Sequence, residues 1–243
     1  MAIWNPWHGC RKVSPGCRNC YVYRRDAEFG KDSSIVTKTS TFDLPLKRDR
    51  RRAYKLQPED GPVYTCMTSD FFIREADEWR PEIWKIIRTR EDLHFVIITK
   101  RIERFMECIP PDWGRGYENV TVCCTCENQE MADRRLPVFL EMPVRHKEII
   151  HEPMLGEIHI EKYLASGQIE HVTCGGESGE GARLLDYSWV LSVREQCIAA
   201  GVSFYFKQTG AVFQKDGKIY RIARKNQLSQ DRKAGIDYGG ISS

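Results

Sequence analysis

The sequence lacks any apolar run approaching the 18 or more residues that a membrane-spanning helix needs. Its first residues also lack the charged and apolar regions of a secretory signal peptide. We therefore expect a cytoplasmic protein that does not associate with membranes. In that reducing compartment, the ten cysteines are read as metal ligands, catalytic thiols or buried small residues rather than as disulfides.

Internal repeats, low-complexity linkers and a strong net charge are missing as well. A formal charge of +3 over 243 residues is too small to indicate nucleic-acid binding by itself. One basic run stands out at residues 47–52 (KRDRRR). A solvated surface segment is the favoured reading of this run, with phosphate contact as the alternative. The length and the 41% hydrophobic content suit one domain over residues 1–243.

Short apolar runs alternate with helical patterns along the chain. Strands are expected near residues 2–5, 63–67, 95–98, 120–124, 148–150, 171–174 and 202–206. Helices are expected near 81–87, 129–141 and 187–200, the last with Asp186 as N-cap and Gly201 at its end. This order predicts an α/β fold, a partial (βα) TIM-like barrel of about six to seven parallel strands. From about residue 208 we expect an irregular tail, with a hairpin candidate at residues 215–218.

Barrels of this kind gather functional groups at the carboxyl ends of their strands. Six expected strand ends carry polar groups, at residues 68–70, 99–101, 125–128, 151–152, 175–178 and 207–208. A purely structural barrel does not need that pattern, which therefore favours a binding or catalytic site.

The strongest local motif is Cys10-x6-Cys17-x2-Cys20, in a loop that contains glycine and proline. Thiolates bind zinc and iron–sulfur clusters. A closed zinc site wants four ligands, and no fourth ligand stands at matching spacing, because His8 is too close to Cys10. Three cysteines instead leave one iron of a [4Fe–4S] cluster open. We predict the cluster, with a zinc site that uses His8 or a distant ligand as the alternative.

The motif and its flanks, residues 4–10 (WNPWHGC) and 13–21 (VSPGCRNCY), resemble the three-cysteine-motif family first described in bacteriophage genomes. The likeness continues over nearly the whole chain, through residues 67–72, 98–101, 127–128, 152–156, 175–183 and 206–208. That family is similar to a branch of the radical S-adenosylmethionine (SAM) superfamily. The resemblance implies a radical-SAM type barrel with two cofactors, a [4Fe–4S] cluster and S-adenosyl-L-methionine.

The activity that the resemblance implies is queuine lyase, which cleaves a C–N bond of queuine to give 7-aminomethyl-7-deazaguanine in queuosine salvage. Its partners would be a small-molecule substrate of the deazaguanine type and an electron donor such as flavodoxin or ferredoxin. Two alternatives stay open. One is a radical-SAM enzyme that acts on nucleic acid, through residues 47–52, or on another substrate; the other is a zinc-dependent nucleic-acid-binding module.

The resemblance also implies roles for strand-end residues toward the cofactor. Ser69 and Asp70 would meet the methionyl ammonium, although Asp70 alternatively caps a helix over residues 71–78. Lys100 and Arg101 would pair with a carboxylate or ribose. The remaining candidates are Tyr21 or Tyr23 beside the adenine, where packing is an equal alternative, and Glu127 and Asn128 at the ribose.

A deazaguanine presents N–H donors, which suit a carboxylate such as Glu152 or Glu177, and a carbonyl, which suits Lys207 or Gln208. Backbone approach to this ligand is expected at Gly175 and Gly176, with plain turn geometry as the alternative, and Ser178 is a further substrate-binding candidate. His151 and Glu177 are the catalytic candidates, although a single His is more often structural. Finally, we read Cys66, Cys124, Cys126 and Cys174 as buried small residues rather than as ligands of a second cluster.

Overall fold

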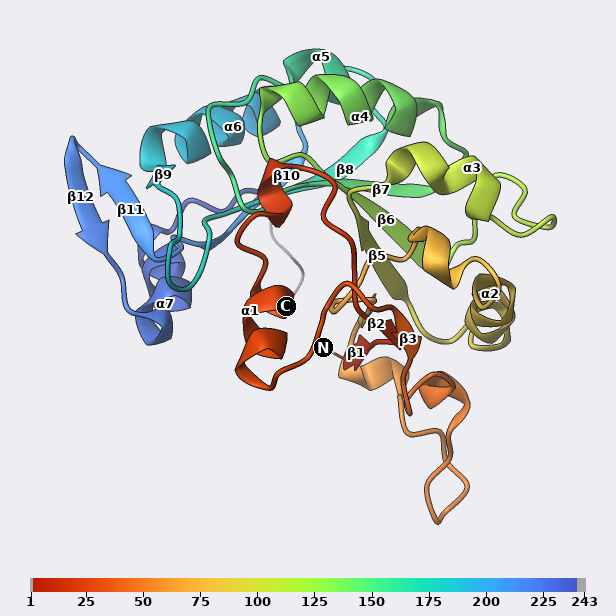
Figure 1. Cartoon of the computed structure of the whole chain (residues 1–243). Helices are drawn as coiled ribbons and strands as arrows, with labels where there is room; N and C mark the ends of the chain where they lie inside the picture. Colours follow the sequence, from red (N-terminus) through yellow and green to blue (C-terminus); the bar gives the residue numbers. More distant parts are fainter. Residues whose placement is uncertain (1, 240–243) are drawn as a thin grey trace. The chain divides into compact units, whose positions relative to one another are not determined.

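The computed structural model describes residues 2–239 (Figure 1). The chain divides into two compact units. The first unit contains residues 2–12, 22–123 and 142–146, and the second contains residues 13–21, 124–141 and 147–239. Residues 1 and 240–243, the two ends of the expected domain, lie outside the described residues. The single domain over residues 1–243 stays a prediction.

In the first unit, three parallel strands pair in chain order. Strand β1 (Ala2–Trp4) pairs with β4 (Val63–Thr65), and β4 pairs with β5 (Phe95–Thr99). A short antiparallel ribbon of β2 (Trp7–His8) and β3 (Thr37–Lys38) follows β1. Because β1 and β2 come directly before Cys10, they fix the start of the motif loop.

Aromatic packing holds the first unit together. Trp84 on α2 (Arg80–Thr89) lies with its ring centroid 4.8 Å from Phe71 and 5.1 Å from Trp113. Pro81 stands in the first turn of α2, where its missing N–H leaves no helical hydrogen bond unmade. The other helices here are α1 (Tyr21–Glu28), α3 (Phe105–Cys108) and the short 3₁₀ segments η2 (Leu44–Leu46), η3 (Pro58–Asp60), η4 (Arg74–Ala76) and η5 (Ile102–Arg104).

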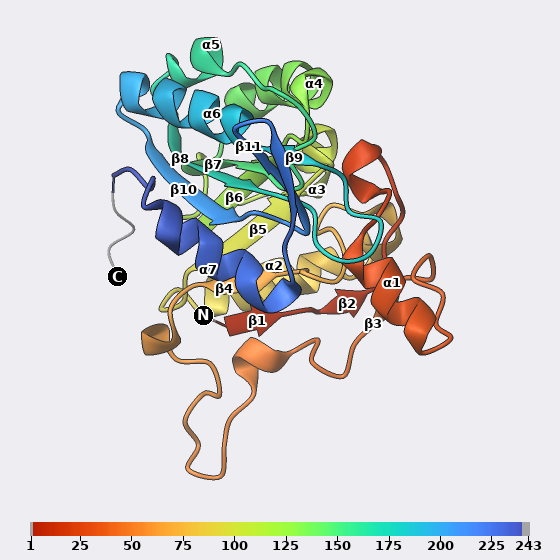
Figure 2. The same cartoon turned by 90° about the vertical axis from the view of Figure 1, so that its left-hand side faces the viewer.

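In the second unit, parallel strands β7 (His146–His151), β8 (Ile169–Gly175) and β10 (Ser203–Gln208) pair in that order. Figure 2 shows α4 (Gln129–Glu141), α5 (Glu161–Leu164) and α6 (Tyr187–Ala200) along one side of these strands. The ends of α6 agree with the prediction. Asp186 accepts the Ser188 N–H at 2.9 Å, and Gly201 takes the left-handed conformation at φ 68°.

The segment from about residue 208 is regular rather than an irregular tail, and the hairpin predicted at residues 215–218 is confirmed. Strands β11 (Val212–Lys215) and β12 (Lys218–Arg221) form the hairpin, and β11 also pairs with β9 (Leu185–Asp186). Asp216 and Gly217 supply the two positive φ angles, 51° and 72°, that a tight hairpin turn requires. Helix α7 (Arg224–Ala234) then packs on β10. Its residues are polar on nearly every side of the helix, so the sequence shows no apolar periodicity from which this helix could be predicted.

The α/β fold class is confirmed, and all seven expected strands are present. The hydrogen-bonded strand order is β1-β4-β5-β6-β7-β8-β10, with β6 spanning Val120–Thr125. The strands thus follow one another in chain order, whereas a doubly wound sheet reverses its order at a switch point. Sequential order is the order of a (βα) barrel. Within residues 2–239, no helix is long and apolar enough to cross a membrane.

Candidate functional site

Exposure separates the ten cysteines into two groups. The motif residues Cys10, Cys17 and Cys20 are partly exposed, and the other seven are buried. Burial raises the pKa of Cys66, Cys126 and Cys174 well above the ordinary thiol value. Together with Cys124, these residues are at most 2% exposed, as expected for buried small residues. The motif thiols are therefore the cysteines that solvent reaches, and their role as metal ligands stays a prediction.

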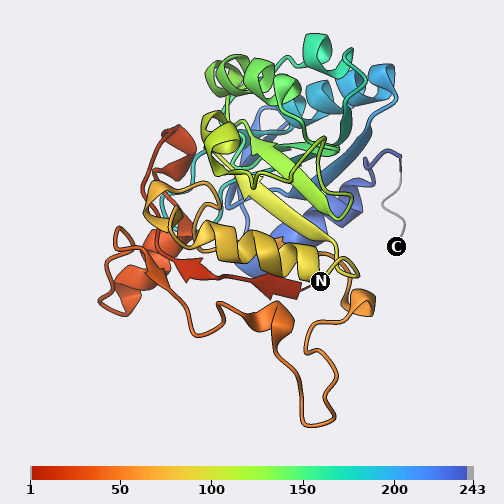
Figure 3. The same cartoon turned by 90° about the vertical axis from the view of Figure 1, so that its right-hand side faces the viewer.

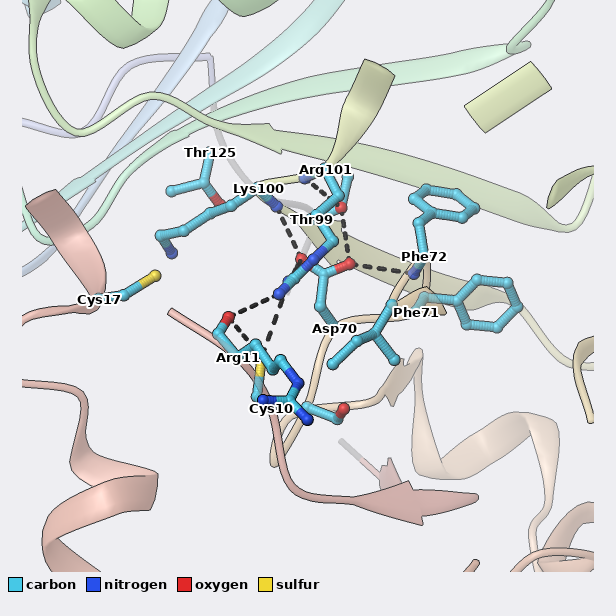
Figure 4. A network of polar contacts seen from close by, with 12 residues as sticks. Cys10, Arg11, Cys17, Asp70, Phe71, Phe72, Thr99, Lys100, Arg101 and Thr125 are labelled. Atoms are coloured by element: carbon cyan, nitrogen blue, oxygen red, sulfur yellow. Dashed lines mark hydrogen bonds and ion pairs between the residues drawn. The ribbon is translucent and has the colours of Figure 1, made fainter. Parts of the chain in front are cut away.

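In the first unit, Cys10 lies beside a buried guanidinium. Arg101 Nη1 is 3.7 Å from Cys10 Sγ and 3.2 Å from Asp70 Oδ2 (Figure 4). Burial lowers the pKa of Arg101, but the charges of Asp70 and Cys10 outweigh burial and raise it overall. A positive charge at this distance from sulfur favours the thiolate, which is the form that binds metal.

Asp70 joins the ends of two strands rather than standing free. Its carboxylate accepts from Thr99 Oγ1 and from the Lys100 backbone N–H, each at 2.9 Å, in addition to the pair with Arg101 (Figure 4). It also accepts from the Phe72 N–H at 3.0 Å. The alternative of a helix over residues 71–78 is wrong, because that segment consists of turns and η4.

The other expected cofactor residues of the first unit lie around Cys10. Ser69 donates from its hydroxyl to the Gly9 carbonyl, and Tyr23 donates to the Cys10 carbonyl. Among the side chains that the structure describes, half-buried Lys100 makes no ion pair, so its ammonium is able to meet a ligand carboxylate. Tyr21, by contrast, is 45% exposed.

In the second unit, Glu127 clamps the motif loop. Its carboxylate is fully buried; Oε1 accepts from the Gly16 N–H at 2.9 Å and Oε2 from Arg135 at 2.7 Å. A Cβ at Gly16 would come within 3.0 Å of this carboxylate, so only glycine fits without a shift. Both oxygens of Glu127 contact protein groups, and its expected role at a ribose stays a prediction. Its neighbour Asn128 caps α4 by accepting from the Met131 N–H at 3.0 Å.

A second carboxylate, Glu177, holds the same loop. Arg183 donates to both of its oxygens, at 3.0 and 2.6 Å, and Asn19 donates to it at 2.9 Å. Arg183 also donates to the Pro15 carbonyl at 2.9 Å. Burial raises the pKa of Glu177, but the hydrogen bonds from Arg183 and Asn19 outweigh burial and lower it overall. An ionised, fully partnered carboxylate fits a positioning role better than proton transfer.

The expected substrate residues at two further strand ends are brought together. Lys207 Nζ lies 2.6 Å from Glu152 Oε2, and Gln208 donates to Oε1 of the same carboxylate. Gly175 lies against this group, since a Cβ there would stand 3.1 Å from Glu152 Oε1. Gly176 instead packs against the backbone of Thr209, and that contact accounts for its lack of a side chain. Beyond this group, Arg224 lies 3.5 Å from the Ser178 hydroxyl.

His151 is fully buried on β7, with Nδ1 against the Cys126 carbonyl. Its Nε2 has no hydrogen-bond partner within the described part of the chain. Burial lowers the pKa of His151 to about 4, so the ring is neutral near pH 7. This environment fits the structural reading of His151 better than a role in moving protons.

Sequence reasoning missed the groups that hold the loop, namely Gly16, Asn19, Arg135 and Arg183. Arg135 lies eight residues after Glu127, in the second turn of α4. No short-range sequence pattern predicts that these two residues pair. Arg183 follows Glu177 within the same glycine-containing segment. This short separation was the one sequence signal that the two residues pair.

Of the side chains described in the structure, no three His, Cys, Asp or Glu residues are grouped as a preformed metal site. Cys10 belongs to the first unit and Cys17 and Cys20 to the second. The chain is thus an α/β protein in which carboxylates at strand ends hold the loop that carries the motif cysteines.

The chain matches the family described as "Protein of unknown function (DUF5131)" over residues 1–238, and it belongs to that family. No curated protein and no solved structure matches it. The resemblance to the radical-SAM superfamily stays a prediction.

The Glu177 contacts predict a pH-dependent stability. Glu177→Gln should lower the free energy of unfolding by about 1–3 kcal/mol near pH 7, because charged hydrogen bonds to Arg183 and Asn19 are weakened. The folded-state pKa is below the unfolded value of about 4.3, so the contribution is full above that value and is lost as the pH falls through the folded pKa.

Urea unfolding of wild type and variant near pH 7 and well below pH 4 measures this difference. Glu91→Gln, at an exposed turn residue, is the control. An equal destabilisation at both pH values would contradict the assignment.

Proposed function

We propose that this protein is a radical SAM enzyme of the cytoplasm whose [4Fe–4S] cluster is bound by Cys10, Cys17 and Cys20. The observation that carries the proposal is the division of the cysteines: the spaced triad is partly exposed, and all seven others are buried. Three thiolates leave one iron of such a cluster open for the amino and carboxylate groups of SAM.

The surroundings of the three cysteines fit this group. Arg101 favours the thiolate at Cys10, and Glu127 and Glu177 fix the loop that carries Cys17 and Cys20. Bound there, the cluster and SAM would supply a 5′-deoxyadenosyl radical after one electron arrives from a donor such as flavodoxin or ferredoxin. On the protein's side, the Lys100 ammonium would pair with the SAM carboxylate.

For the substrate we propose queuine, with cleavage of the C–N bond beside its secondary amine to release 7-aminomethyl-7-deazaguanine and the cyclopentene-diol fragment. The flavodoxin- or ferredoxin-type donor would supply the electrons. The support from the site is the group of Glu152, Lys207 and Gln208, which sets an acceptor next to donors. The guanine-like edge of a deazaguanine offers the complementary set, N–H donors next to a carbonyl. These side chains would orient the base, and orientation is the protein's main contribution to a radical reaction.

Metal analysis tests the cluster. After anaerobic purification, wild type should contain about four irons and four sulfides per chain with a visible absorption band, and Cys17→Ala should lose most of both. Cys108→Ala, which removes a buried thiol outside the motif, should retain them. About one zinc per chain without a chromophore would refute the cluster and favour a zinc-binding module.

Product analysis tests the reaction. Reconstituted enzyme with SAM, reductant and queuine should form 5′-deoxyadenosine and 7-aminomethyl-7-deazaguanine, and without queuine much less. Glu152→Gln should lower kcat/KM by about tenfold or more while iron content stays at the wild-type level, because a charged acceptor for the base is lost. Exposed Glu157→Gln is the control. If the loaded wild-type enzyme forms neither product, queuine is not the substrate.

A further inference from the structure

A basic loop at residues 47–55 extends away from β1, β3 and α2. Figures 1 and 3 both show this segment, which we call the basic finger, projecting beyond the strands of the first unit. Its tip carries Arg50, Arg51 and Arg52, all exposed. Within residues 2–239, none of these three guanidinium groups makes a hydrogen bond or ion pair.

The tip is preorganised by its own acidic residue. Asp49 Oδ1 accepts from the Arg51 N–H at 2.8 Å and from the Ala53 N–H at 3.0 Å, and the Asp49 N–H donates to the Ala53 carbonyl at 2.8 Å. The one carboxylate of the finger is therefore turned onto the loop backbone. Arg52 adopts a positive φ of 65°, an unfavourable conformation for a residue with a side chain. Local strain that keeps an arginine at a turn is typical of functional loops.

The base of the basic finger is fastened to the core. Arg48 and Arg90 lie 3.8 and 4.0 Å from the Tyr54 ring centroid, and Arg48 pairs with Tyr54 as an isolated bridge. Arg90 is 1% exposed and donates to the Leu56 carbonyl at 2.8 Å. A loop that merely tolerates solvent needs no such buried anchor, whereas a loop that binds a partner gains affinity from being ordered beforehand.

We propose that the basic finger binds the phosphodiester backbone of a nucleic acid. Arginine guanidinium groups match phosphate oxygens in geometry and charge. The only aromatic side chain of the basic finger, Tyr54, is occupied by Arg48 and Arg90 at its ring, and residues 48–53 offer no apolar side chain larger than Ala53. Protein partners usually need an apolar anchor at the centre of an interface. A polyanion backbone needs none, so nucleic acid is favoured over an acidic protein. The inference is independent of the cluster and of the proposed reaction.

Fluorescence anisotropy with labelled single-stranded RNA and double-stranded DNA, between about 50 and 200 mM salt, tests the proposal. The variant Arg50→Ala/Arg51→Ala/Arg52→Ala should bind about tenfold or more weakly, and the slope of log K against log salt should become shallower by about two to three, one unit for each lost phosphate contact. The matched control Lys218→Ala/Arg221→Ala/Lys225→Ala removes three exposed positive charges elsewhere and should change affinity less than about threefold.

Tighter binding of the RNA or of the DNA would support the proposal and identify the source of the backbone. Equal losses in the two triple variants, or an unchanged salt slope, would overturn it, because binding would then follow overall charge alone. Equally tight, finger-dependent binding of polyglutamate would also overturn it, in favour of an acidic protein. Because the three arginines are exposed, circular dichroism of the finger variant should match wild type.

Discussion

The buried carboxylate of Glu127 is the interaction on which the motif loop depends. It lies at the end of β6 and holds the Gly16 N–H with one oxygen and Arg135 with the other. A buried charge is tolerated only when it is paired and hydrogen-bonded, so this geometry leaves the loop little freedom. Because Gly16 directly precedes Cys17, the position of that thiol follows from the position of Glu127.

At two other strand ends, a carboxylate likewise holds neighbouring groups through hydrogen bonds or an ion pair. Glu177 holds the loop at Asn19 and, through Arg183, at Pro15. In the first unit, Asp70 orients Arg101, which in turn lies beside Cys10. Strand-end carboxylates thus act on the cysteines through the neighbouring chain, and such supporting contacts commonly tune metal ligands. In the second unit, the Glu152 carboxylate, which is part of the candidate substrate group, does not take part in this support.

Much of the fold was predictable because buried strands are short apolar runs, and because Asp186 and Gly201 mark the ends of α6 by local chemistry. Helix α7 was not predictable, since it is polar and forms by packing on β10. For the site, the spacing of the three cysteines and the polar strand ends were evident. The sequence did not distinguish a carboxylate that meets a ligand from one that meets a distant arginine. Glu127 and Glu177 stay candidates for ligand contacts, and their protein partners Arg135 and Arg183 emerge only from the tertiary structure.

The most direct test of this account is iron retention in Gly16→Ala beside Gly156→Ala. A Cβ at Gly16 meets the Glu127 carboxylate at 3.0 Å, whereas one at Gly156 meets nothing within 4 Å. The measurement is the chelator concentration that removes half of the iron from anaerobically reconstituted protein. This concentration should fall by about tenfold for Gly16→Ala, the magnitude typical of changes around metal ligands. It should stay at the wild-type value for Gly156→Ala. Equal retention in both variants would contradict the proposal that Glu127 positions the loop of the proposed cluster ligands Cys17 and Cys20.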